Sequence, residues 1–474
     1  MSFHADRPPR VHFSGIGGTA MVAGARLALE AGWEVRGSDG PLYPPTSDLV
    51  RALNVPVAES YATENLDWEP DLVVVGNALS RGNAELEAVL ERGLHYVSLP
   101  EWLRDVVLRA RTPIVIAGTH GKTTTTTLTA YLLDRGGANP GYLIGGQALD
   151  FEHSARLGAE GAPFVIEGDE YDSAFFDKRA KFLHYLPAIA VVTSIEFDHA
   201  DIYDNIREIE IAFERLLRQI PASGQLIACA DHARSRALCD DAPCRTMTYG
   251  FDDAADWRAV DTGILEGMQT FDVHRDGQVW GAFSMPLIGR HNVSNALAAI
   301  AVAEMHDISP ESIQSALRAF KGVRRRMETF HEAEGIVFID DFAHHPTAIT
   351  EVLRAARSRW PENRLVVLLE PRTNTLSTNR FQFDIARSLQ GADLVWLGPI
   401  HRADRIPEDK RLDRDLLADT LRGHDVEVWI AGQVDAMVEE LRAEAQPGDV
   451  VLVLSNGAFG GIYDLLRKAF QGSG

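Results

Sequence analysis

The sequence predicts an α/β protein of three consecutive blocks, each built around a parallel sheet. Short apolar runs typical of strands alternate with helical patterns from end to end, as they do in parallel α/β proteins. Glycine turns follow two of these runs, and a new strand begins shortly after residue 111 and again after residue 327. At 474 residues, the chain also has the length of about three domains.

The first block is expected to span residues 1–111. A strand, a glycine turn and a helix ending at Glu30 open it, and two further strands and a second helix follow. The pattern places the three strands and the second helix at 11–15, 33–39, 71–77 and 83–92.

The second block is expected to span residues 112–327. It begins with a strand, a glycine turn and a helix that starts at Lys122. Later strands and two closing helices flank a less regular region over 221–290. The expected strands and closing helices lie at 114–118, 164–170, 188–199, 295–306 and 310–320.

The third block, residues 328–474, repeats strands with helical patterns between them. Its strands are almost continuously apolar, which is typical of parallel strands covered on both faces. They are expected at 335–341, 364–370, 393–397, 426–430 and 449–455.

Composition excludes several classes of function. The chain carries 46 basic and 68 acidic residues, for a net charge of −22, and this disfavours nucleic-acid and polybasic membrane-surface binding. The three cysteines form no C-x-x-C pair and indicate free thiols in a reducing compartment, with metal binding as the alternative. No signal-peptide pattern and no apolar run of about 18 residues is present. We therefore expect a cytoplasmic protein without membrane insertion, and no obligate protein partner is evident.

The glycine turn of the second block is expected to hold the phosphates of ATP. A loop between a strand and a helix directs backbone N–H groups and the helix N-terminus at an anion. Lys122, one of only six lysines, would reach the β and γ phosphates, and Thr123 would bind Mg²⁺. The first glycine of the usual consensus is replaced by Ile116, so only the shorter core is present. The loop comprises Gly118, Thr119, His120, Gly121, Lys122, Thr123 and Thr124.

Acidic residues follow the next two strands. The carboxyl ends of parallel strands share one edge of a sheet, so these groups should lie beside the phosphate loop. Carboxylates there suit Mg²⁺ shared with phosphate oxygens. His199 is interpreted as a metal ligand or a proton carrier, with a solvated loop histidine as the alternative. The acidic groups are Glu167, Asp169, Glu170 and Asp172 after one strand, and Glu196 and Asp198 after the other.

Two further segments have open interpretations. His291, Asn292 and Asn295 at the start of an alanine-rich helix suit hydrogen bonds to adenine, but asparagine is also a common N-cap. Arg324, Arg325 and Arg326 would stabilise phosphoryl charge, or would form a solvated linker.

The first glycine turn fits a dinucleotide fingerprint. Residues 15–20 read G-x-G-x-x-A, and Asp39 ends the following strand. An NAD-dependent oxidoreductase would use this turn but would leave residues 118–126 without a role. A nucleotide-diphosphate sugar fits the turn equally well, and two nucleotide sites favour a ligase. A non-catalytic nucleotide-binding scaffold would not explain the clustered carboxylates.

The motifs together resemble the Mur ligase family, the ATP-dependent amide ligases that build the peptidoglycan peptide. The resemblance covers nearly the whole chain. It implies the three-domain Mur ligase architecture, with a Rossmann-like N-terminal domain, a P-loop ATPase central domain and a Rossmann-like C-terminal domain that closes on ATP. The motifs are GIGG (15–18), GTHGKTTTT (118–126), EGDEYD (167–172), SIEFDHAD (194–201), GRHNVSNALAA (289–299) and DDFAHHPTA (340–348).

The resemblance also implies roles for individual residues. Lys122, Glu170, His199 and Arg326 would be catalytic, and one or two Mg²⁺ ions would be bound by Thr123, Glu170 and His199. His291, Asn292 and Asn295 would contact adenine, while Arg326 and Asp340 would face phosphate and ribose. Several family members use a carbamylated lysine, but the helix over 206–219 contains no lysine. The UDP-sugar would be bound by Gly15, Ile16, Gly17, Gly18, Ser38, Asp39 and Asn77.

Within the family, two kinds of member use UDP-N-acetylmuramate as acceptor. One adds L-alanine, and the other adds the preformed tripeptide L-alanyl-γ-D-glutamyl-meso-diaminopimelate during cell-wall recycling. Four segments favour the tripeptide enzyme and leave the L-alanine enzyme as the alternative. We further hypothesise that Arg372, with Lys178 or Arg179, binds the carboxylates of the peptide. The four segments are 76–83, 170–185, 370–375 and 455–462.

Overall fold

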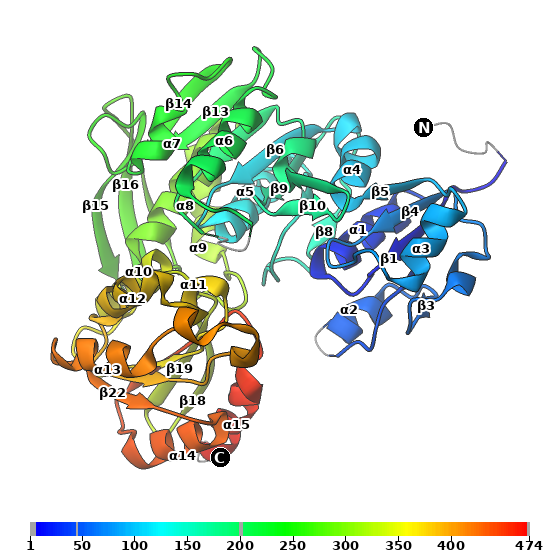
Figure 1. Ribbon diagram of the computed structural model, residues 1–474. Helices are drawn as coiled ribbons and strands as arrows, with labels where there is room; N and C mark the ends of the chain where they lie inside the picture. The colour runs from blue at the N-terminus through cyan, green and yellow to red at the C-terminus, as the bar shows by residue number, and fades with distance from the viewer. Residues whose placement is uncertain (1–5, 44–45, 199–201, 472–474) are drawn as a thin grey trace.

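The computed structural model describes residues 6–43, 46–198 and 202–471. These residues form three main sheets with helices packed against them, plus one two-stranded hairpin. In Figure 1 the first block (blue) stands apart on one side of the central block (cyan to green), and the third block (yellow to red) packs on another side. The predicted three-block α/β fold class is confirmed. We propose that the three blocks span residues 1–111, 112–327 and 328–474.

The first sheet is parallel throughout, in the order β3-β2-β1-β4-β5. Asn83 caps α3 through its side chain, and Ser98 with Glu101 forms a capping box at α4. The strands are β1 Arg10–Ser14, β2 Glu34–Ser38, β3 Val57–Ala58, β4 Leu72–Val75 and β5 Tyr96–Ser98. The α-helices are α1 Thr19–Glu30, α2 Thr46–Ala52, α3 Ala84–Glu91 and α4 Leu99–Trp102.

The central sheet contains ten strands in the order β17-β16-β15-β14-β13-β12-β6-β9-β7-β8. It is parallel from β15 to β7 and antiparallel at both edges. The strands are β6 Thr112–Ala117, β7 Gly141–Leu143, β8 Ala155–Arg156, β9 Pro163–Gly168, β12 Ile189–Val192, β13 Gln225–Cys229, β14 Arg245–Gly250, β15 Trp257–Leu265, β16 Met268–Arg275 and β17 Gln278–Met285. The α-helices are α5 Lys122–Arg135, α6 Ile206–Leu217, α7 Ala233–Ala237, α8 Arg290–Glu304 and α9 Pro310–Ala319.

The region over 221–290 is more regular than the sequence predicted, because it contains five strands. The strands β15 and β17 are largely exposed along part of their length, so they lack the continuous apolar runs of buried strands. Their turns have positive φ at Glu266-Gly267 and Asp276-Gly277, as two-residue hairpin turns require.

Two helices with small side chains pack together over the central sheet. The threonine-rich α5 and the alanine-rich α8 are buried along most of their length and contact each other. Thr125 donates a hydrogen bond to Asn295 over 3.1 Å across this contact. The start of α8 is therefore held beside the glycine turn that begins α5.

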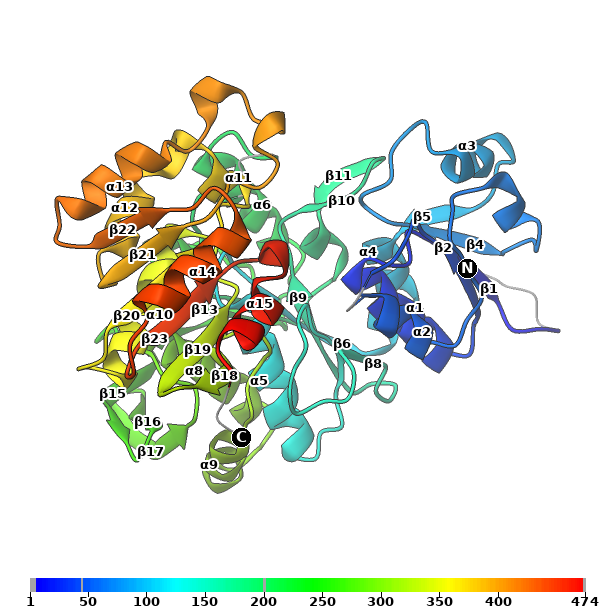
Figure 2. The same ribbon diagram turned by 90° about the horizontal axis from the view of Figure 1, so that it is seen from below.

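A hairpin of the central block, β10 (Asp172–Ala174) and β11 (Asp177–Ala180), reaches the first block (Figure 2). Phe176 at its tip lies with its ring centroid 5.0 Å from that of Tyr96, and Phe175 packs on the first block's apolar cluster. Asn77 donates a hydrogen bond to Asp172 over 3.1 Å. The hairpin thus ties the two blocks together beside the carboxyl end of β4.

The third sheet has the order β18-β19-β23-β20-β21-β22, with only β18 antiparallel to its neighbour. Its strands are β18 Glu328–Ala333, β19 Ile336–Asp341, β20 Leu365–Leu369, β21 Leu394–Leu397, β22 Glu427–Ile430 and β23 Val450–Leu454. The α-helices are α10 Pro346–Arg359, α11 Asn374–Ser377, α12 Gln382–Leu389, α13 Arg414–Arg422, α14 Val434–Glu444 and α15 Ile462–Ala469. Among the described residues of all three blocks, no helix is both long enough and apolar enough to span a bilayer.

Candidate active site

The glycine turn of the central block connects β6 to α5. Gly118 and Gly121 adopt φ values of +132° and +79°. A Cβ at Gly118 would lie 2.1 Å from the hydroxyl oxygen of Thr193, and one at Gly121 would lie 2.4 Å from the amide oxygen of Asn295. Only glycine fits these positions, and the first N–H groups of α5 remain available to an anion.

Lys122 is the first residue of α5 and is partly buried in this turn. Its ammonium donates hydrogen bonds to the carbonyl of Gly118 over 2.7 Å and to Oε2 of Glu170 over 2.8 Å. Burial alone would lower the pKa of Lys122, but the carboxylates of Glu170 and Asp169 outweigh it and raise that pKa. A positive charge is therefore held at the phosphate loop.

Oxygen donors surround Thr123, the next residue. Its hydroxyl donates to Oε1 of Glu167 over 2.9 Å, and the backbone N–H of Gly145 donates to the other oxygen of that carboxylate. Burial raises the pKa of Glu167, and Glu170 is 1 % exposed. The Thr123 hydroxyl and the Glu167 carboxylate are oxygen groups of the kind that Mg²⁺ prefers, and Glu170 pairs with the neighbouring Lys122. His199, the other predicted metal ligand, lies outside the described residues.

A cavity of about 560 Å³ lies between the second and third blocks. The phosphate loop, the start of α8 and the start of α10 line it. Phe251 contributes to the wall and lies beneath the Arg290 guanidinium, which is 3.5 Å from its ring centroid. The cavity brings together seven of the predicted ATP-binding residues: His120, Gly121, Thr124, His291, Asn292, Asn295 and Arg326.

Asn292 and Asn295 do not cap α8, so the interpretation of these asparagines as N-caps is wrong. Gly289 occupies the N-cap of α8, with no side-chain cap hydrogen bond. Asn292 donates to the carbonyl of Ile288, and Asn295 accepts from Thr125. Both amides are buried and fixed in orientation at the cavity wall.

His291 is a neutral hydrogen-bonding group in the same wall. Burial lowers its pKa to about 4. Its Nδ1 has no hydrogen-bond partner among the described residues, and the nearest ion-pair partner, Glu351, is 3.9 Å away. The ring is therefore available to a ligand base.

Of the three consecutive arginines, only Arg326 lines the cavity. Arg324 is exposed and pairs with Glu328. Arg325 is half-buried and donates to Asp340 over 3.0 Å and to the hydroxyl of Tyr463 over 2.9 Å.

The adjacent acid, Asp341, lines the cavity, whereas Asp340 does not. Successive residues of β19 point to opposite faces of the sheet, so only one of the two can face the nucleotide. Asp341 is thus the acid of this pair that lines the cavity, and the assignment of Asp340 by the family resemblance stays a prediction. Asp341 accepts hydrogen bonds from the backbone of Met327 and Ala343, and burial raises its pKa to about 6.

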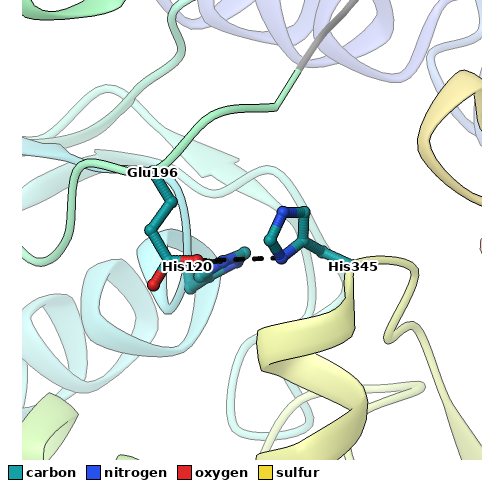
Figure 3. Close-up of side chains that lie close together, drawn as sticks. All are labelled: His120, Glu196 and His345. Atoms are coloured by element: carbon teal, nitrogen blue, oxygen red, sulfur yellow. Dashed lines mark hydrogen bonds and ion pairs between the residues drawn. The ribbon is translucent and has the colours of Figure 1, made fainter. Parts of the chain in front are cut away.

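A carboxylate with two imidazoles joins the central and third blocks (Figure 3). Oε2 of Glu196 lies 3.3 Å from Nε2 of His120 and 3.8 Å from Nδ1 of His345. Thr347, at the start of α10, donates to the same oxygen over 2.6 Å. Sequence reasoning assigned no role to His345 or Thr347, because only the tertiary fold brings them to the phosphate loop.

In the first block, the predicted UDP-sugar residues gather at the carboxyl ends of β1, β2 and β4. The N–H of Gly17 donates to Asp39 over 2.6 Å, and the hydroxyl of Tyr61 donates to the other oxygen over 2.8 Å. Tyr61 was not predicted. Ile16 is fully buried and Ser38 donates to Glu85, so these two side chains support the turn from within. Gly15, Gly18 and Asn77 complete the set.

The predicted peptide-binding cations lie on different blocks. Arg372 follows β20 in the third block and contacts Glu370 and His401 over 3.3 and 3.4 Å. Lys178 and Arg179 lie on β11 of the central block and pair with Asp172 and Asp177.

Comparisons with known proteins cover almost the whole chain. Three family profiles match in order: the Mur ligase family catalytic domain over 10–111, the Mur ligase middle domain over 116–303 and the Mur ligase glutamate ligase domain over 325–457. The UDP-N-acetylmuramate–L-alanyl-γ-D-glutamyl-meso-2,6-diaminoheptandioate ligase of Escherichia coli K12 is 40% identical over 466 residues, covering 96% of this chain and 97% of the relative. The chain belongs to the Mur ligase family.

Two further relatives bear on substrate choice within the Mur ligases. The UDP-N-acetylmuramate–L-alanine ligase of Dinoroseobacter shibae is 38% identical, covering 94% of both chains. The crystal structure of a murein peptide ligase from Psychrobacter arcticus superposes with a TM-score of 0.72 at 35% identity, covering 97% of this chain and 98% of the other. Mur ligases are ATP-dependent enzymes that form amide bonds, so an oxidoreductase role for the first glycine turn is left without support.

Proposed function

We propose that this chain joins the tripeptide L-alanyl-γ-D-glutamyl-meso-diaminopimelate to the lactyl carboxylate of UDP-N-acetylmuramate and consumes ATP. Similarity over nearly the full length to ligases named for that tripeptide supports the choice of peptide. Addition of L-alanine is the alternative, supported by relatives of 38% identity and below. We place the enzyme in the cytoplasm, where ATP is available.

The observation that carries the ligase chemistry is the Lys122–Glu170 pair in a glycine turn that faces a large cavity. A carboxylate is a poor electrophile because its charge repels an amine. Transfer of the γ-phosphoryl group of ATP onto the lactyl carboxylate gives an acyl phosphate and ADP. The α-amine of the peptide then attacks the acyl carbon, a C–N bond forms, and inorganic phosphate leaves with the electrons of the broken C–O bond.

The residues around the turn would divide this work. The loop N–H groups would orient the β and γ phosphates, and Lys122 would offset the charge of the group in transfer. Arg326 would approach the same charge from the third block. Thr123 and Glu170 would hold one Mg²⁺ and His199 a second, which together would supply further neutralisation of phosphate charge. His291, Asn292 and Asn295 would hold adenine, and Asp341 would face the ribose.

The acceptor and the peptide would enter from the two outer blocks. The glycine turn over residues 15–18, with Asp39 and Asn77, would bind the UDP-sugar at the carboxyl ends of the first sheet. Arg372 would bind a carboxylate of the peptide, because its planar guanidinium offers two parallel donors. Lys178 or Arg179 would bind another, on the hairpin that joins the first two blocks.

Release of inorganic phosphate tests this function. We expect phosphate only when ATP, UDP-N-acetylmuramate and peptide are all present, with the tripeptide used far better than L-alanine. Lys122→Met should lower the rate by about two to three orders of magnitude, the usual effect of losing a charge-stabilising group. Lys321→Met, on the surface, is the matched control. Equal or better use of L-alanine would instead assign the alternative substrate.

A further inference from the structure

We propose that His120, Glu196 and His345 form a binding site for a zinc-type transition-metal ion. The site is separate from the oxygen donors around Thr123, and its ligands come from two blocks. His120 belongs to the phosphate loop, Glu196 follows β12, and His345 immediately precedes α10. This inference concerns binding by the protein without nucleotide, so it stands independently of the substrate proposed above.

The donor atoms are spaced for one ion. Each residue offers one atom, and all three atoms lie within 4.8 Å of one another. Glu196 Oε2 is 3.3 Å from the His120 nitrogen and 3.8 Å from the His345 nitrogen. Zinc bonds of about 2.0–2.2 Å to nitrogen and oxygen give tetrahedral donor separations of about 3.4 Å. Small side-chain rotations therefore complete the geometry.

The ring nitrogen of His345 that points away from Glu196 has the kind of hydrogen-bond partner found at metal-bound histidines. Its Nε2 donates to the backbone carbonyl of Phe197 over 3.2 Å, and its Nδ1 faces Glu196. Nδ1 also accepts the capping hydrogen bond from Thr347 N–H over 3.3 Å, and a bound ion would take the place of that N–H. A carbonyl that accepts the second ring N–H fixes the tautomer of a metal-ligating histidine.

The groups around His120, Glu196 and His345 favour a metal ion that prefers nitrogen ligands. The carboxylate of Asp198, which accepts a hydrogen bond from Thr375 over 2.7 Å, acts on His345 together with that of Glu196. Two imidazoles suit Zn²⁺ and Co²⁺, whereas Mg²⁺ prefers oxygen ligands. An excess of Mg²⁺ should therefore not displace the ion. Figure 3 shows the three side chains converging from the loop and from α10, so a bound ion would hold these two blocks together.

Titration of the full-length, metal-free protein with Zn²⁺ in excess Mg²⁺ and without nucleotide tests the site. We expect one equivalent to bind, and Co²⁺ to give the visible absorption of a nitrogen- and oxygen-ligated ion. Glu196→Gln and His345→Asn should each weaken binding at least tenfold. Asparagine at 345 can still accept the capping hydrogen bond that Thr347 N–H donates to His345, so α10 keeps its first turn. The control, His153→Gln, alters a surface His–Glu pair and should leave binding unchanged.

Two results would overturn the proposal. One is wild-type binding no tighter than that of Glu196→Gln. The other is a bound ion that excess Mg²⁺ displaces, because that ion would occupy the oxygen site at Thr123 instead. Hydrogen exchange adds an independent readout, since Zn²⁺ should change exchange at the start of α10 in the wild type and not in His345→Asn.

Discussion

At the scale of single residues, Arg372 shows how a candidate peptide-binding charge is positioned by its neighbours. Arg372 is held between Glu370 and His401 and packs closely on Gly457. Its side chain is 31 % exposed, so part of the guanidinium faces outward at the carboxyl end of β20. This is the position expected for a group that binds an incoming carboxylate.

Arg372→Ala should therefore raise the KM for the tripeptide about 10- to 100-fold, since charge-assisted hydrogen bonds contribute about 1.5–3 kcal/mol. The KM for ATP should change little, because the nucleotide cavity is lined by other residues. Steady-state kinetics with each substrate varied in turn measures both constants. An unchanged peptide KM would remove Arg372 from the proposed binding site.

Asp341 gives a prediction about pH and stability. An unfolded aspartate titrates near about 3.9, but burial raises the folded pKa of Asp341 to about 6. The folded state thus binds this proton more tightly than the unfolded state does. The resulting contribution to the free energy of unfolding is complete below about pH 4 and is lost as pH rises through 6. At about 1.4 kcal/mol per unit, the loss is about 3 kcal/mol. Relative to Asp341→Asn, the Tm of the wild type should fall between about pH 4 and pH 7. A constant Tm difference across that range would contradict the assignment.

At the scale of elements, the hairpin β10–β11 is one of the contacts that attach the first block to the central block. The Phe176–Tyr96 ring pair and the Asn77–Asp172 hydrogen bond both join it to the first block. An aromatic pair contributes roughly 1 kcal/mol. Phe176→Ala should therefore raise the KM for the UDP-sugar about fivefold and leave that for ATP unchanged. Phe383→Ala, which removes an exposed ring on α12, is the control. Equal effects on both substrates would indicate general destabilisation.

Elements with local signals were predictable, and those that depend on tertiary contacts were not. The buried parallel strands and the loop over 118–124 follow from apolar runs and adjacent glycines. The hairpins of β15–β17 were missed because their exposed faces interrupt the apolar pattern. Asp340 and Asp341 are adjacent acids, and only the direction of each side chain from β19 distinguishes them. Tyr61 is more than 20 residues of chain away from its partner Asp39. His345 is more than 200 residues away from His120.

At the scale of the whole molecule, the third block is docked on the loop that follows β12. The Arg380 guanidinium lies 4.1 Å from the Phe197 ring centroid and donates to the carbonyl of Asp204 over 2.7 Å. Thr375 and His345 contact the same loop at Asp198 and Phe197. Since the cavity proposed to bind ATP has walls from both blocks, this docking completes it.

Arg380→Ala should loosen that docking. We expect a kcat lowered several-fold and a larger radius of gyration by small-angle X-ray scattering, because a cation–π contact and a hydrogen bond across the blocks are both lost. Arg387→Ala, which removes an exposed pair with Asp384 on the neighbouring helix α12, should change neither. If Arg380→Ala kept the kcat and the radius of gyration of the wild type, the remaining contacts would be sufficient to dock the third block.

The hairpin β10–β11 begins only two residues after Glu170, the carboxylate that holds Lys122. The contact between Phe176 and Tyr96 and the Lys122–Glu170 pair are therefore joined by one short stretch of chain. A displacement of the first block that moved this hairpin would also shift the carboxylate that holds Lys122.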